Sequence, residues 1–167
     1  IPTSLLHING QNFTVSADIA TKGEVSSIRI ENEETHFASS MQLLTPALRD
    51  KLVDYQIEGK FLSRTEIRSH FGPGEDPNVS IDFKLPDNEV TAKGYSFSGV
   101  TMKGRFANRW FDDERSFSEK RGKIRLDLED LSCQFDLFKL SSPKVSIKTN
   151  KKGTKLKTNL QVVAKAS

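Results

Sequence analysis

The stretch VSIDFKLPDNEVTAKGYSFSGVTMKGRFAN, from Val79 to Asn108, decides the fold class. Its first seven residues alternate between apolar and polar, so an extended backbone places every apolar side chain on one face. The pattern predicts a half-buried strand over 79–85, a turn at Pro86–Glu89 and a second strand through Val90, which together form a hairpin. The alternation returns over 100–106. The stretch therefore predicts an antiparallel meander with one apolar face.

Most of the chain repeats this alternation. Asn-Gly at positions 9 and 10 joins two alternating runs, which is a strong hairpin signal. Two further strands are predicted over 25–32 and 35–43, separated by a charged turn at 32–34. More alternating runs follow over 56–65 and from residue 124 to residue 162, so that the whole sequence predicts about a dozen strands.

The period changes between Leu44 and Tyr55, in the sequence LTPALRDKLVDY. Apolar residues recur there at helical spacing, Thr45 can act as an N-cap, and Pro46 suits the first helical position. We expect one short amphipathic helix at about 45–55, which lies across the sheet either as a plug or as a lid over a ligand groove. Breakers predict an exposed loop over 70–78, and the loss of alternation predicts a long charged loop at about 109–122.

Length and composition indicate one β-rich domain spanning residues 1–167. The chain starts at Ile1 rather than at a methionine, which suggests a piece of a longer protein. Its 25 Lys and Arg against 22 Asp and Glu give a net charge of only +3, so we expect no nucleic-acid partner. Lysines gather near a predicted turn at 150–153, either to blunt a sheet edge or to contact anionic lipid.

No catalytic or metal-binding constellation is found in the sequence. It contains no phosphate loop, zinc spacing or nucleophile elbow. Cys133 lies in an alternating run typical of a core position, Glu75 and Asp76 are too few to hold calcium, and Asp112 and Asp113 are adjacent rather than held apart as a glycosidase requires. We therefore expect a protein that is not an enzyme and that carries no metal or cofactor.

A long sheet with one apolar face must cover that face. It can close into a barrel, pack against a second sheet, or accept an apolar molecule from outside. The pattern of strands alone leaves a two-sheet sandwich and an open half-barrel unresolved.

The order of motifs from the predicted helix onward resembles the periplasmic region of AsmA-like proteins, in particular their Bacteroidetes-like versions. The helix leads into YQIEG, a Gly/Pro loop ends in DPNVSIDFKL, and a Phe-rich strand precedes the Pro143, Val145, Ile147 pattern. Val100, Gly104, Phe106 and Asn108 match a hydrophobic, Gly, Phe, Asn signature. The resemblance covers roughly 44–148, and the chain departs from it in its Asp-Pro-Asn loop and in the charged segment 109–121.

This resemblance implies a repeating β-groove, a mainly β antiparallel meander that forms an open half-barrel. It also implies a non-enzymatic, periplasmic protein, anchored in the inner membrane by a segment outside this chain, that accommodates or transfers phospholipid and supports the outer membrane. The alternating strands supply candidate residues for the lipid groove: Val79, Ile81, Phe83, Val100, Met102, Phe106, Leu126, Val145 and Ile147. Each of these could instead be an ordinary core residue.

A competing hypothesis is a β-sandwich that binds carbohydrate or mediates adhesion through surface aromatics such as Tyr95, Trp110 and Phe111. A closed sandwich would have no continuous apolar trough. In either case the terminal strands would leave open sheet edges, which could pair with a second copy of the chain.

Overall fold

The structure, a computed structural model, describes residues 3–8, 10–20, 25–41, 49–50, 53–70, 77–110, 123–150 and 153–164. These residues form eleven strands and one helix: β1 Thr3–Ile8, β2 Gln11–Asp18, β3 Ser26–Thr35, α1 Phe37–Met41, β4 Tyr55–Glu58, β5 Phe61–Ser69, β6 Asn78–Ala92, β7 Tyr95–Trp110, β8 Lys123–Phe135, β9 Phe138–Asn150, β10 Gly153–Thr158 and β11 Gln161–Ala164.

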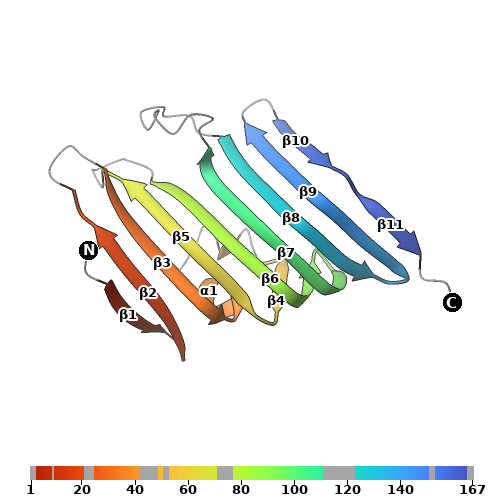
Figure 1. Cartoon of the computed structure of the whole chain (residues 1–167), viewed down its shortest axis with the longest axis horizontal. Helices are drawn as coiled ribbons and strands as arrows, with labels where there is room; N and C mark the ends of the chain where they lie inside the picture. Colours follow the sequence, from red (N-terminus) through yellow and green to blue (C-terminus); the bar gives the residue numbers. More distant parts are fainter. Residues whose placement is uncertain are drawn as a thin grey trace.

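All the strands belong to one antiparallel sheet, in the order β1-β2-β3-β5-β6-β7-β8-β9-β10 (Figure 1). β6 pairs with both β5 and β4 along one of its edges. In the same way, β9 pairs with both β10 and β11 along one edge. The sheet is open, and β1 lies at the opposite edge from β10 and β11. The predicted mainly β, open meander is confirmed, and the described residues form no second sheet of a sandwich.

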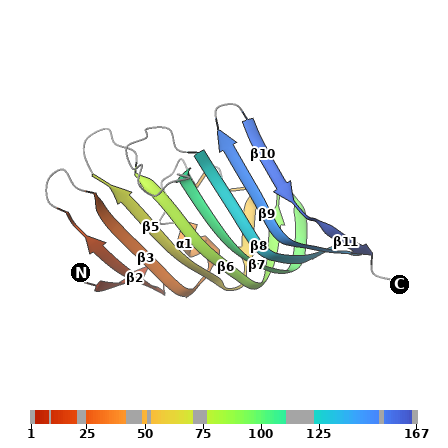
Figure 2. The same cartoon turned by 45° about the horizontal axis from the view of Figure 1, so that its top comes forward.

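The sheet bends along a line of irregular pairing that crosses its central strands. The register shifts between Leu85 and Val90 on β6 and between Ser98 and Lys103 on β7, and Asp130 on β8 has a positive φ of 54°. Bulges of this kind bend a strand and increase its twist. Beyond the line, the lower ends of β6 and β7 curve back toward the side on which α1 and β4 lie (Figure 2).

The predicted turn at 86–89 is wrong, because β6 runs unbroken from Asn78 to Ala92. The hairpin turn lies instead at Lys93 and Gly94, whose positive φ values of 50° and 83° suit a two-residue connection. Pro86 is tolerated inside β6 because it falls in the gap where pairing with β5 has ended at Lys84 and pairing with β4 has not yet begun.

The predicted strand over 35–43 is also wrong. β3 continues through the predicted turn at 32–34 and ends at Thr35, after which the chain forms α1. Buried Asn32 accounts for this ending, since its Oδ1 accepts a hydrogen bond from Ser63 N at 2.6 Å and its Nδ2 donates to Thr35 Oγ1 at 2.8 Å. Phe37 and Met41, spaced one helical turn apart, were the local signal for a helix.

Much of the predicted helix at about 45–55 lies outside the described residues. Residues 49–50 are helical, 53–54 form a turn, and Tyr55 already belongs to β4. The predicted loops at 70–78 and 109–122 lie largely outside the described residues too, although Asn78 begins β6, and Arg109 and Trp110 end β7.

Candidate functional site

One face of the sheet carries an unbroken row of uncharged residues, which we call the central row. Residues directly opposite one another on antiparallel strands point to the same face, so the register defines the row. It crosses nine strands, from β1 to β10: Ser4, Val15, Ile30, Thr65, Ile81, Phe106, Leu126, Ile147 and Leu156. From Val15 to Ile147 these residues are half-buried.

Two flanking rows extend this apolar face on either side of the central row. The first approaches the bend and contains Asn32, Ser63, Phe83, Gly104, Leu128, Val145 and Thr158. The second contains Ala17, Ile28, Ile67 and Val79, followed on β8 to β10 by Ile124, Thr149 and Thr154. None of the residues in these three rows is charged.

The structure places the sequence-predicted candidates on this same face, but in two different environments. Ile81, Phe106, Leu126 and Ile147 lie together in the central row, and Val79, Phe83 and Val145 lie in the flanking rows. Val100 and Met102 lie at the bend instead. Val15, Ile28, Ile30 and Ile67 also lie in these rows and were not among the predicted candidates, although the alternation in SSIRIENEET and FLSRTEIRS marks the last three.

Beyond the bend, the apolar face becomes a closed core, which we call the curled end. Its buried members are Phe61, Leu85, Val100 and Cys133, against which partly buried apolar side chains pack. Phe37 of α1 covers Phe61 edge to face, with ring centroids 5.5 Å apart, and the Phe61 ring stacks on Phe83 at 6.2 Å. Val100, only 3% exposed, is therefore a core residue.

Gly104 lies between the curled end and the central row, directly opposite Phe83. A Cβ added at Gly104 would meet the Phe83 ring, so the glycine leaves the space in which the ring lies across the neighbouring strand. Asn108, further along β7, accepts a hydrogen bond from Val79 N and donates one to Pro77 O, at 2.8 and 3.0 Å. It thereby fixes the start of β6 next to β7.

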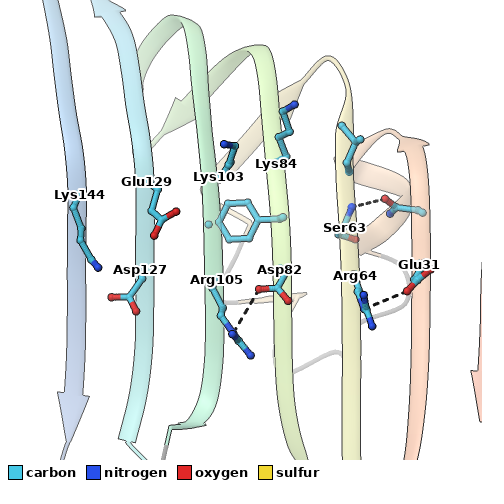
Figure 3. A pocket seen from close by; sticks show the side chains of 14 residues that line it. Glu31, Ser63, Arg64, Asp82, Lys84, Lys103, Arg105, Asp127, Glu129 and Lys144 are labelled. Carbon is cyan, nitrogen blue, oxygen red and sulfur yellow. Dashed lines mark hydrogen bonds and ion pairs between the residues drawn. The ribbon is translucent and has the colours of Figure 1, made fainter. Parts of the chain in front are cut away.

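The opposite face of the sheet is charged, and one of its rows alternates in sign across five strands. The row contains Glu31, Arg64, Asp82, Arg105 and Asp127 (Figure 3). Arg64 Nε lies 3.2 Å from Glu31 Oε1, and Arg105 Nε lies 3.5 Å from Asp82 Oδ1. These groups line an open depression of about 750 Å³. Exposed ion pairs contribute little stability each, so this face is best understood as a solvated surface.

Sequence reasoning missed the charged row, because alternation along one strand does not reveal which charges lie opposite one another on the next. Each strand contained one clue, a charged residue whose two neighbours in the sequence point to the apolar face. These residues are Glu31, Arg64, Asp82, Arg105 and Asp127. The register that brings them together depends on turn positions, and the predicted turns at 32–34 and 86–89 were both wrong.

Among the described residues, no three His, Cys, Asp or Glu side chains gather as they would around a metal ion. Burial raises the pKa of the Cys133 thiol, which favours the unreactive protonated form. No helix within the described ranges has both the length and the apolar character to span a membrane. The described strands present two contrasting surfaces, an extended apolar face and, behind it, a charged one.

Comparisons with protein-family models, with curated proteins and with solved structures find no match to this chain.

Proposed function

We propose that the apolar face of this sheet accommodates the acyl chain of a lipid. The observation that carries the proposal is the central row, which crosses nine strands without a charge and stays half-buried from Val15 to Ile147. A core residue of a closed fold would be shielded far more completely, as Val100 is at the curled end. The half-exposed side chains are available to an apolar partner.

The dimensions suit such a ligand. Nine strands about 4.8 Å apart and three rows about 7 Å apart span an area on the order of 500 Å². Exposed apolar patches of a few hundred Å² lie at the upper end of what monomeric proteins expose and often serve binding; within this area the aliphatic and aromatic side chains alternate with Ser, Thr and Asn. An acyl chain that fills one leaflet, about 15 Å long, would fit along the central row and gain roughly 0.8 kcal/mol for each methylene that leaves water.

The wider assignment follows the resemblance to AsmA-like proteins. In this proposal, the chain is part of a periplasmic β-groove protein that is anchored in the inner membrane, handles phospholipid and supports the outer membrane without catalysing a reaction. The signature residues on β7 support it, since Gly104 and Asn108 each have a definite scaffold role beside Phe83 and Val79. The carbohydrate-binding alternative gains no such support, because the described strands form one sheet.

A second copy of the chain is a further partner in the proposal. β1 forms an outer edge of the sheet and carries no Lys, Arg, Asp or Glu, the residues with which many proteins protect such edges. Edge-to-edge self-association through β1 would lengthen the central row, which would remain uncharged.

The test uses a fluorescent fatty acid, together with native mass spectrometry of the protein purified from bacterial cells. Ile81→Lys places a charge in the central row, and we expect it to weaken fatty-acid binding roughly 10- to 100-fold, because burying an unpaired polar group costs about 1–3 kcal/mol. Ser80→Lys is the matched control: it adds the same charge one residue away on the opposite face, where it faces Glu66.

Acyl lipid that co-purifies with the wild type and with Ser80→Lys, but not with Ile81→Lys, supports the proposal. A lipid-free wild type that also fails to bind the fluorescent fatty acid overturns it. Equal losses in the two variants, with unchanged circular dichroism, would also count against the apolar face as the binding surface.

A further inference from the structure

The edge of the sheet formed by β10 and β11 carries exposed apolar side chains, as does β1 at the opposite edge, where residues 3–7 are all exposed. Every residue of β10 and β11 is exposed, although each strand pairs with β9 on its inner side. Several large aliphatic side chains lie there in water, namely Leu160 at 53%, Val162 at 54% and Val163 at 61% exposure, in addition to Leu156 of the central row at 59%. Apolar groups this open at a strand edge indicate a surface that meets a partner.

Cations gather at the same edge, on the charged face. Arg125, Lys148 and Lys155 lie directly opposite one another on β8, β9 and β10. Lys144 and Lys157 lie beside them, and the five cations line a cavity of about 630 Å³ that also includes Ser146, Thr158 and Asn159. We call these five cations the basic edge.

The basic edge departs from the charge alternation found elsewhere on this face. Like charges that face each other across strands destabilise a sheet, yet here three cations follow in one row. Two carboxylates on β8 face this group of cations: Asp127, which is ion-paired with Arg125, and Glu129, which lies opposite Lys144. Among the described residues, these carboxylates leave Lys148, Lys155 and Lys157 in surplus.

A second pair of lysines on the same face has different surroundings from the basic edge. Lys84 and Lys103 also face each other, on β6 and β7. Lys103 Nζ lies 3.4 Å from Asp130 Oδ2, however, and Glu129 lies opposite Lys103 on its other side, so carboxylates surround this pair. The surplus of positive charge is a property of the β10 edge and not of lysines on this face in general.

We propose that the β10–β11 edge docks on a lipid surface that bears anionic headgroups. The basic edge contacts headgroup phosphates, and the aliphatic side chains around Leu160 and Val163 enter the interface. Lasting attachment of a protein to a bilayer surface generally needs both electrostatic attraction and buried apolar groups, and this edge supplies both within a few residues. A free phosphate or a nucleic acid would engage the lysines but leave the aliphatic groups in water. Docking does not require that the apolar face hold an acyl chain.

Co-sedimentation with vesicles tests the inference. The wild type should bind phosphatidylcholine vesicles that contain phosphatidylglycerol, bind pure phosphatidylcholine vesicles much more weakly, and lose binding as salt is raised. Each lysine near an anionic surface contributes roughly fivefold to binding, so neutralising Lys148→Gln, Lys155→Gln and Lys157→Gln together should weaken it on the order of 100-fold. The matched control, Lys84→Gln with Lys103→Gln, removes lysines from the same face and should change binding only a few-fold.

A second variant tests the insertion of the aliphatic side chains separately from the electrostatic attraction of the lysines. Leu160→Ser with Val163→Ser keeps every charge and should still weaken vesicle binding, whereas it should leave the binding of inorganic phosphate unchanged. Binding of inorganic phosphate without vesicle binding would overturn the proposal, as would equal effects of the two lysine variants. Because Ile81→Lys leaves this edge intact, loss of fatty-acid binding with normal vesicle docking would separate this inference from the proposed function.

Discussion

Leu85 and Ile81 lie on the same strand and point to the same face, four residues apart, yet their surroundings differ. Leu85 is 1% exposed and packs within the curled end, whereas Ile81 is half-buried in the central row. The difference arises because the sheet bends between Leu85 and Val90, which brings α1, β4 and the ends of β6 and β7 over one end of the apolar face. One sheet thus provides a core at one end and an open apolar surface at the other.

A single layer can therefore be stable while much of its apolar face stays accessible. The curled end gathers one cluster of buried aromatic and aliphatic side chains, and Phe13 and Val145 are buried outside it. The central row is then free to meet a partner without being needed to hold the fold together. Substitutions on either side of the bend test this division of roles.

The largest effect is expected at the curled end. Leu85→Ala should lower the free energy of unfolding by roughly 2–5 kcal/mol, because it leaves a cavity among fully buried side chains. Ile81→Ala, on the same strand and face, should cost no more than about 1 kcal/mol, since Ile81 already keeps part of its surface in water. Urea denaturation followed by circular dichroism measures both, and equal losses would contradict the division between core and open face.

A smaller effect is expected from two asparagines that tie strands together on either side of the bend. Asn88 is buried and its Nδ2 donates to Glu58 O and Lys60 O, each at 3.0 Å, so Asn88→Ala should cost about 2 kcal/mol by leaving both carbonyls unpaired. Asn108 makes a similar pair of bonds in a more exposed setting, so Asn108→Ala should cost less than 1 kcal/mol, because water can replace the lost partner.

The same denaturation experiment measures both asparagine variants. A larger loss for Asn108→Ala than for Asn88→Ala would show that the open part of the sheet, and not the curled end, limits stability.

The bend itself was beyond the sequence analysis, for a reason visible at Pro86 to Asn88. This segment reads as a turn because Pro, Asp and Asn all favour turns, but buried Asn88 uses its side chain to bind the β4–β5 connection, and β6 continues past it. That use depends on a contact 28 to 30 residues away, which no local pattern reveals. The sequence therefore predicted the strands and their faces but not the place where the sheet folds over.

The candidate residues show the same limit. Alternation correctly placed Ile81, Phe106, Leu126 and Ile147 on one face, because the period of two is a local property of a strand. It did not separate them from Val100, since burial at the curled end depends on α1 and on the bulges. The charged row opposite was missed for a related reason, because it exists only through the register.

The smallest effect on stability, and the sharpest on reactivity, is expected at Cys133. Its burial at the curled end raises the pKa of the thiol, so below about pH 9 native Cys133 should react with a thiol reagent far more slowly than the unfolded chain does. The raised pKa leaves stability unchanged below the pKa of the unfolded thiol and lowers it as the pH rises above that value, because the unfolded chain then releases the proton first.

The matched comparison places a thiol in the central row instead, as Ile81→Cys in a Cys133→Ala background. We expect this half-exposed cysteine to react much faster in the native protein. The absorbance of the released reagent measures both reaction rates. Similar rates at the two positions would mean that the curled end opens as readily as the apolar face.

The nearly sequential strand order has a consequence for how the chain folds. From β5 to β10 every strand pairs with its neighbour in the sequence, and β1 to β3 do so as well. Contacts between close segments need little loop-closure entropy, and proteins rich in them fold faster than β proteins with distant pairings. Hairpins can therefore form first within β1 to β3 and within β5 to β10. The step that joins these two parts is the pairing of β3 with β5, between which α1 and β4 lie in the sequence. We expect folding to be limited by this one closure, which also completes the curled end.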